Sequence, residues 1–128
     1  MQGPSKTKVQ SYRDLIVWQK AMDLVVECYK LTKRLPDWER FGLASQLQRA
    51  AVSVPANIAE GQGRWSLGEK LQHFSIANGS LKEVETHLLI GVRLGYFQEA
   101  ETSNAMGLAV EVAKMLPALM YKLRARKE

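Results

Sequence analysis

The sequence predicts an all-α protein, an antiparallel four-helix bundle of up-down-up-down topology. In four long segments, apolar residues recur at alternating spacings of three and four, which places them on one face of a helix. Short stretches with proline or glycine separate these segments, and no segment shows sustained strand alternation. The 128 residues suffice for one domain with a core. We therefore expect a flexible tail over residues 1–10 and a single domain over residues 11–126.

The first expected helix spans residues 12–34 and ends before Pro36. It carries two adjacent apolar stripes. The members of one stripe are Leu15, Trp18, Met22, Val25 and Tyr29. The members of the other are Ala21, Leu24, Cys28, Leu31 and Leu35. Because one stripe suffices to face the bundle core, the second indicates a contact between subunits.

The second expected helix spans residues 39–61 and contains Pro55 in its interior. An interior proline removes one backbone hydrogen bond and costs roughly 3 kcal/mol. The apolar spacing nevertheless continues in register from Val54 to Ile58. We therefore predict one kinked helix, with two shorter helices as the alternative.

The third expected helix begins at Ser66 and ends near Gly95. Ser66 and Glu69 have the spacing of a capping box, in which each side chain bonds the backbone N–H of the other residue. Gly79 lies in the middle of this helix, where glycine is a poor helix former. We predict that a close contact with another helix accounts for Gly79.

The fourth expected helix begins at Gln98 or Thr102 and ends at Arg126, with a bend at Pro117. No stretch of about 18 apolar residues exists in the chain, so we expect no membrane span. Residues 1–10 have no apolar core of a secretory signal, so a cytoplasmic protein is the expectation.

The chain contains no recognisable catalytic constellation. His73 and His87 lie about four turns apart on one helix, roughly 21 Å at 1.5 Å per residue, so they cannot hold one metal. The Glu-x-x-His pairs of a di-iron bundle are absent. Cys28 is the single cysteine, which excludes an internal disulfide and a cysteine-built zinc site. We expect no enzyme activity, no metal and no cofactor.

A polar stripe beside the core face of the second helix is the first candidate site. Its members recur at spacings of three and four: Gln46, Arg49, Ser53, Asn57, Glu60 and Arg64. Glu83 of the third helix is placed to meet it. We interpret Arg49, Ser53, Asn57, Glu60 and Glu83 as a buried or interfacial network, with Arg49 paired to a glutamate, because such networks fix register and assembly. A ligand site is the alternative interpretation.

A basic end is the second candidate site. The net charge is +5, and the bundle topology brings two helix starts and two helix ends together. The cations expected there are Arg13, Arg64, Lys70, Lys122, Arg124, Arg126 and Lys127. Few acids accompany them, whereas the opposite end mixes both signs. This end favours a polyanion with salt-sensitive affinity; solvated helix ends that complement the helix dipole are the alternative.

Several segments resemble the 23S rRNA intervening-sequence protein family. They are residues 18–21, 41–61, 76–85 and 94–96, and the similarity extends over about residues 12–123. The most specific run is residues 49–61, Arg-Ala-Ala-Val-Ser-Val-Pro-Ala-Asn-Ile-Ala-Glu-Gly. Asn78 departs from the pattern, because the family usually has a small residue there.

The resemblance implies a small bacterial four-helix bundle without enzymatic activity, of which some members form ring-like homopentamers. The family is similar to the accessory variability protein of diversity-generating retroelements, which assists a reverse transcriptase and binds nucleic acid. The resemblance also implies that Arg49, Ser53, Asn57, Glu60 and Glu83 belong to a shared motif, without giving them a catalytic role.

Together, the sequence and the resemblance predict a non-enzymatic, ring-like homo-oligomer that binds RNA or DNA through its basic end. It is expected to act as an accessory to a partner such as a reverse transcriptase. The alternative is a protein-interaction or structural oligomer with no role in nucleic-acid binding. An enzyme that uses the stripe from Arg49 to Glu60 is the least favoured hypothesis.

Overall fold

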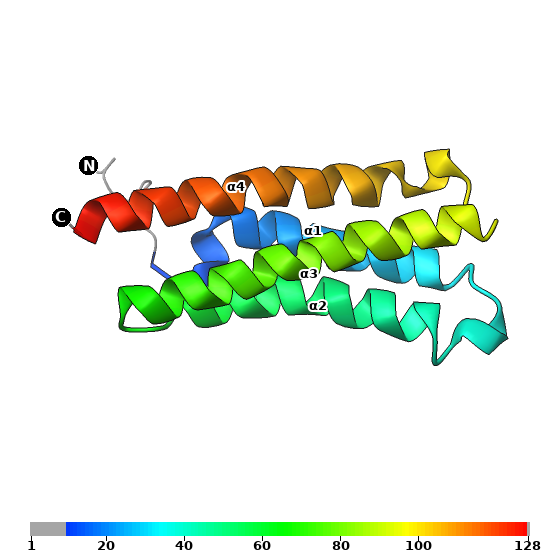
Figure 1. Ribbon diagram of the computed structural model, residues 1–128, viewed down its shortest axis with the longest axis horizontal. Helices are drawn as coiled ribbons and strands as arrows, with labels where there is room; N and C mark the ends of the chain where they lie inside the picture. The colour runs from blue at the N-terminus through cyan, green and yellow to red at the C-terminus, as the bar shows by residue number, and fades with distance from the viewer. Residues whose placement is uncertain (1–9, 128) are drawn as a thin grey trace.

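Four antiparallel helices with short connections lie side by side around one shared core (Figure 1). The computed structural model describes residues 10–127, excluding the side chain of residue 127. The four helices are α1 (Ile16–Thr32), α2 (Leu43–Gln62), α3 (Leu67–Arg93) and α4 (Ser103–Lys127). Short 3-10 helices precede three of them, namely η2 (Tyr12–Asp14), η3 (Asp37–Glu39) and η4 (Glu99–Thr102). The predicted all-α bundle is therefore confirmed.

The two apolar stripes of α1 have different environments. Ala21, Leu24 and Cys28 of one stripe are completely buried in the core. Met22 and Tyr29 of the other stripe are 42% and 41% exposed. One stripe thus builds the bundle, as predicted, and part of the second is left on the surface of the protomer.

The start of α1 differs from the prediction, because η2 takes up the first residues. The carboxylate of Asp14 accepts hydrogen bonds from the backbone N–H groups of Gln10 and Ser11, at 2.8 and 3.2 Å. Leu15 is extended (φ −74°, ψ 124°), so the α-helix begins only at Ile16. The tail predicted over residues 1–10 lies outside the described residues, apart from Gln10.

The start of α2 was also predicted too early. Glu39 ends η3, and its Oε1 accepts a hydrogen bond of 2.9 Å from the backbone N–H of Leu43. Gly42 between them has φ −110° and ψ −111°, which no helix adopts. Glu39 therefore caps α2 from outside the helix and is not part of it.

Pro55 lies inside a continuous helix. α2 runs unbroken through it to Gln62, so the prediction of one helix is confirmed and the alternative of two shorter helices is wrong. The Pro55 side chain is buried. Pro117 likewise lies within α4, where it is exposed to solvent.

Ser66 starts α3 with half of the predicted capping box. Its hydroxyl accepts a hydrogen bond of 3.1 Å from the backbone N–H of Glu69, whereas the described residues show no return bond from the Glu69 side chain. At the other end, Gly95 has φ 81°, a left-handed conformation that glycine adopts without strain. This turn ends α3 near Gly95, as predicted.

The prediction that a helix contact accounts for Gly79 is wrong within the protomer. Gly79 is exposed, and a Cβ built on it would have no described heavy atom within 4 Å. Among the glycines inside helices, the close approaches occur at Gly61, where a Cβ would lie 2.7 Å from Cε1 of Phe74, and at Gly91, where it would lie 2.5 Å from Cδ2 of Phe97. The apolar spacing agrees with these positions: Gly61 lies three residues after the buried Ile58 and Gly91 three residues after the buried Leu88, whereas residue 79 falls on the opposite face of α3.

Candidate functional site: a polar seam and a basic end

A chain of hydrogen bonds joins α2 to α3; we call it the polar seam, formed by Ser53, Asn57 and Glu60 of α2 with His73 and Ser80 of α3. Ser80 donates its hydroxyl hydrogen to Ser53 Oγ at 2.8 Å. Asn57 Nδ2 donates to Ser53 Oγ at 3.0 Å and to the Ser53 carbonyl at 2.9 Å. The predicted network thus exists for the central part of the stripe, and it links two helices of one protomer.

His73 extends the polar seam toward the α2–α3 turn. Its Nδ1 lies 3.1 Å from Asn57 Oδ1, and since Asn57 Nδ2 already donates to Ser53, His73 Nδ1 is the donor. Glu60 Oε1 is 4.0 Å from the same nitrogen, and Glu60 Oε2 is 3.3 Å from Arg64. Asn57 therefore holds both the histidine and its own helix backbone.

Sequence reasoning missed His73 and Ser80 as members of this network. The signal was available, because residues 73, 80 and 87 recur every seven positions, which places His73, Ser80 and His87 on one face of α3. That face lies against the polar stripe of α2. Reading the two helices as an antiparallel pair would have matched Ser80 with Ser53.

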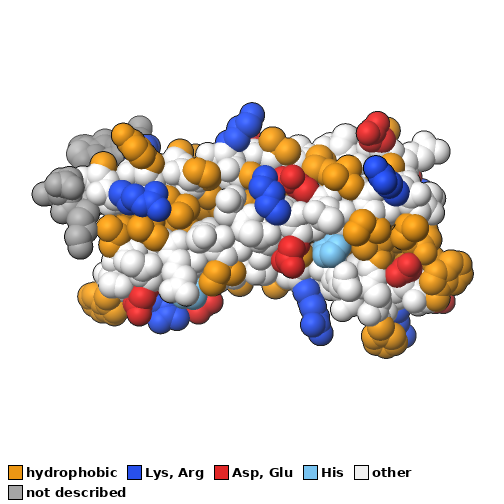
Figure 2. Space-filling model, in the orientation of Figure 1, with side chains coloured by type: hydrophobic (Ala, Val, Ile, Leu, Met, Phe, Trp, Pro, Cys, Tyr) orange, Lys and Arg blue, Asp and Glu red, His pale blue; other side chains and the backbone are white. Residues whose placement is uncertain are grey.

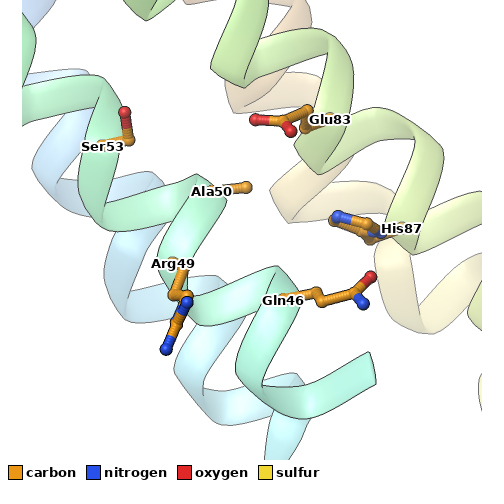
Figure 3. Close-up of a pocket in the computed structure, with 6 residues that line it drawn as sticks. All are labelled: Gln46, Arg49, Ala50, Ser53, Glu83 and His87. Atoms are coloured by element: carbon orange, nitrogen blue, oxygen red, sulfur yellow. The ribbon is translucent and has the colours of Figure 1, made fainter. Parts of the chain in front are cut away.

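Beyond Ser53, the stripe opens into a groove of about 250 Å³ between α2 and α3 (Figure 3). Its lining residues are Gln46, Arg49, Ala50, Ser53, Glu83 and His87. The expected pairing of Arg49 with a glutamate does not form within the protomer, because Arg49 makes no ion pair among the described residues. Figure 3 shows it pointing away from Glu83. Arg49 lies at the outer edge of the stripe, where its guanidinium stays hydrated without the cost of burial.

The groove leaves one buried polar atom unused. Nδ1 of His87 is buried and has no hydrogen-bond partner among the described residues.

Burial and the charge of Glu27 raise the pKa of Cys28 to about 12, so its thiol stays protonated and unreactive. The described residues contain no group of three His, Cys, Asp or Glu placed to hold a metal.

The basic end predicted from topology is present. The starts of α1 and α3 and the ends of α2 and α4 share one end of the bundle, on the left in Figure 1. We call this end of the bundle the basic end. It carries the predicted cations Arg13, Arg64, Lys70, Lys122, Arg124 and Arg126. All are exposed except Lys70, which is half-buried; the side chain of Lys127, also predicted, lies outside the described residues.

The cations of the basic end differ in whether they have a partner within the protomer. Arg64 pairs with Glu60, and Lys70 Nζ donates to the carbonyl of Gln62 at 2.9 Å. In contrast, Lys122, Arg124 and Arg126 have no carboxylate partner within the described part of the chain. Their charges at the end of α4 are therefore available to an external anion.

The opposite end mixes charges and hydrophobic side chains. Arg34, in the turn after α1, pairs with Glu101 at 2.6 Å. Glu39 Oε2 accepts a hydrogen bond of 2.8 Å from the Tyr96 hydroxyl. The bonds from the Leu43 N–H and from Tyr96 lower the pKa of Glu39, and the Glu39 carboxylate raises the pKa of Tyr96. Figure 2 shows hydrophobic side chains gathered at this end, on the right. The two ends are thus chemically different.

The fold and the two sites define a small helical bundle with an internal polar seam and positive charge collected at one end. None of the helices in the described range has the length and apolarity to span a bilayer. The chain belongs to the 23S rRNA-intervening sequence protein family, whose model matches residues 13–118. This confirms the resemblance found in the sequence.

Among solved structures, the chain is similar to a protein with unknown function from the S23 ribosomal protein family of Bacteroides thetaiotaomicron. The two share 24% sequence identity with a TM-score of 0.76, over 82% of this chain and 98% of that one. At this identity the similarity establishes the fold alone. No curated protein matches the chain.

Proposed function

We propose that this protein is a non-enzymatic, cytoplasmic oligomer that binds the phosphates of RNA or DNA through its basic end, as an accessory to a partner such as a reverse transcriptase. The observation that carries the proposal is a set of cations at the end of α4, beside Arg13 and Arg64. Lys122, Arg124 and Arg126 have no carboxylate partner among residues 10–126. Unpaired cations gain the most from a polyanion, because no internal ion pair has to break.

The decisive variant is Arg124→Glu combined with Arg126→Glu. Each phosphate contact contributes about 0.9 to the slope of log affinity against log salt for duplex DNA and about 0.7 for a single strand. Losing two contacts should lower that slope by roughly 1.4–1.8 and weaken binding at every salt concentration. Fluorescence anisotropy with a labelled RNA, titrated at several salt concentrations, measures both quantities.

The matched control is Lys33→Glu combined with Arg93→Glu. Lys33 caps the end of α1 and Arg93 ends α3, so these variants change the net charge equally and also at helix C-termini, but at the opposite end of the bundle. The control should bind RNA as the parent does. Equal binding by the parent and the Arg124/Arg126 variant would contradict the proposal.

The oligomer part of the proposal is supported by the exposed part of the α1 stripe that contains Met22 and Tyr29. Met22 and Tyr29 leave apolar surface in water, and Val52 of α2 is 43% exposed. The family resemblance favours a homopentamer, in which several basic ends share one rim. Light scattering at micromolar concentration tests it, and a monomer would contradict it.

The same stripe also favours a second candidate, a structural or protein-binding oligomer without a nucleic-acid role. In that case the open groove with Arg49 and Glu83 supplies polar contacts between copies. Both candidates predict an oligomer by light scattering. RNA binding at moderate salt distinguishes them, because the second candidate predicts none.

A further inference from the structure

Trp65 is the most exposed large hydrophobic side chain among the described residues. Its exposed fraction is 98%, and it lies in the turn between the end of α2 and the start of α3. A tryptophan side chain can bury roughly 150–250 Å². Because Trp65 is exposed, the protomer gains almost none of the favourable free energy of burying this surface.

Backbone bonds hold the turn around Trp65 on both sides. The Gly63 N–H donates to the carbonyls of Ala59 and Glu60, at 3.2 and 3.1 Å. On the other side, the Ser66 hydroxyl caps α3 at 3.1 Å. The ring is therefore presented by an ordered connection, and a ligand that covers it has little backbone to immobilise.

Positive charge flanks the exposed ring. Arg64 immediately precedes Trp65, and its pairing with Glu60 joins two side chains that are 44% and 55% exposed. Such exposed pairs contribute little, so the guanidinium can turn to another anion. Lys70 Nζ is held at the carbonyl of Gln62, at the start of the same turn.

We propose that Trp65 stacks on an unpaired base, which makes single-stranded nucleic acid or a single-stranded loop the ligand class of the basic end. Within a duplex, neighbouring base pairs cover the faces of each base, whereas a single strand offers an open face to an aromatic ring. The flanking phosphates then lie within reach of the cations around Trp65. Since every base has such a face, the recognition tolerates any sequence. This inference rests on the proposed function and specifies its ligand.

The test compares two labelled RNAs, an oligouridine of about 12 nucleotides and a duplex of about 12 base pairs, the size range of one single-strand site. Trp65→Ala should weaken binding of the single strand by about 5- to 150-fold and leave duplex binding unchanged. Trp65→Phe keeps an aromatic face and should fall between Trp65→Ala and the parent. The substitutions lie on an exposed turn, so thermal unfolding should not change.

Phe41→Ala is the matched control. Phe41 is 88% exposed, and the guanidinium of Arg40 lies 5.4 Å from the centre of its ring, at the opposite end of the bundle. Phe41 is thus also an exposed aromatic ring beside an arginine. Phe41→Ala should change the affinity for neither the single-stranded nor the duplex RNA.

Three results would overturn the inference. If Trp65→Ala binds the single strand as the parent does while Arg124→Glu/Arg126→Glu still loses affinity, stacking is wrong and the basic end stands. If Trp65→Ala lost the same affinity for the single strand and for the duplex, the contribution of Trp65 to binding would not depend on unpaired bases, and stacking would be wrong. Absence of binding to either RNA by the parent refutes the proposed function itself, and the assignment of Trp65 with it.

Discussion

Two glycines of α3 should respond with opposite signs to the same substitution. Gly79 is exposed, and a Cβ there meets no described atom within 4 Å. At Gly91 a Cβ would lie 2.5 and 2.6 Å from two carbons of the Phe97 ring, which is only 3% exposed. Both lie inside one helix, so Gly79→Ala and Gly91→Ala share the same gain in helix propensity and differ in packing.

The magnitudes follow from these distances. Alanine inside a helix is favoured over glycine by about 1 kcal/mol, which should raise the unfolding free energy of Gly79→Ala by 0.5–1 kcal/mol. Carbon atoms prefer separations of about 3.5–4.0 Å, so the Phe97 ring must move by about 1 Å to admit a methyl group at residue 91. Overpacking of this kind costs about 1–3 kcal/mol, and Gly91→Ala should therefore be less stable than Gly79→Ala by that amount.

Urea unfolding followed by circular dichroism, at one fixed protein concentration, measures both variants against the parent. Gly79→Ala should move the midpoint up without changing the slope. A destabilised Gly79→Ala would refute the reasoning from the protomer. If light scattering also showed a smaller assembly, Gly79 would lie at a contact between subunits. Equal stability of the two variants would show that Phe97 accommodates the methyl group freely.

Two further predictions concern hydrogen bonds. The pKa of Glu39 is lowered in the folded protein, so its bonds stabilise the fold above the ordinary carboxyl pKa of 4.5 and are lost as pH falls through the lowered value. The stability difference between the parent and Glu39→Gln, from urea unfolding, should therefore narrow from neutral pH to about pH 3; a constant difference would argue against this. Ser53→Ala removes the acceptor of Ser80 and of Asn57 and should cost about 1–2 kcal/mol. Adding Ser80→Ala should recover part of that loss, since no buried hydroxyl then lacks a partner; an unchanged midpoint for Ser53→Ala would contradict the network.

Periodicity was sufficient to predict the four helices and the core stripe of α1, because burial of one face repeats along the whole helix. It did not locate the starts of α1 and α2, which depend on single side-chain bonds. Glu39 has good helix propensity, yet its carboxylate is used to bond the N–H of Leu43, and so it lies outside α2. The contact predicted at Gly79 was wrong even by periodicity, because the apolar spacing of α3 places residue 79 opposite the core face and Gly91 on it.

The candidate sites were predictable to different degrees. The basic end followed from topology, since charge at a helix terminus needs no side-chain detail. Only part of the polar seam could be predicted from the sequence. Ser53 and Asn57 were identified, but their partners His73 and Ser80 depend on the register between α2 and α3. Trp65 was not identified because the apolar patterns used for helices say nothing about a residue in a turn.

The buried Cys28 leaves the described surface of the bundle without a thiol, which suits the molecule to site-specific labelling. A maleimide reacts with thiolate, and a buried thiol with a pKa of about 12 supplies almost none near neutral pH. Gly68 lies in the first turn of α3, is exposed, and has open space where a side chain would begin. A fluorophore on Gly68→Cys would therefore sit beside the turn that carries Trp65 and report directly on a strand arriving there, with the native cysteine left in place.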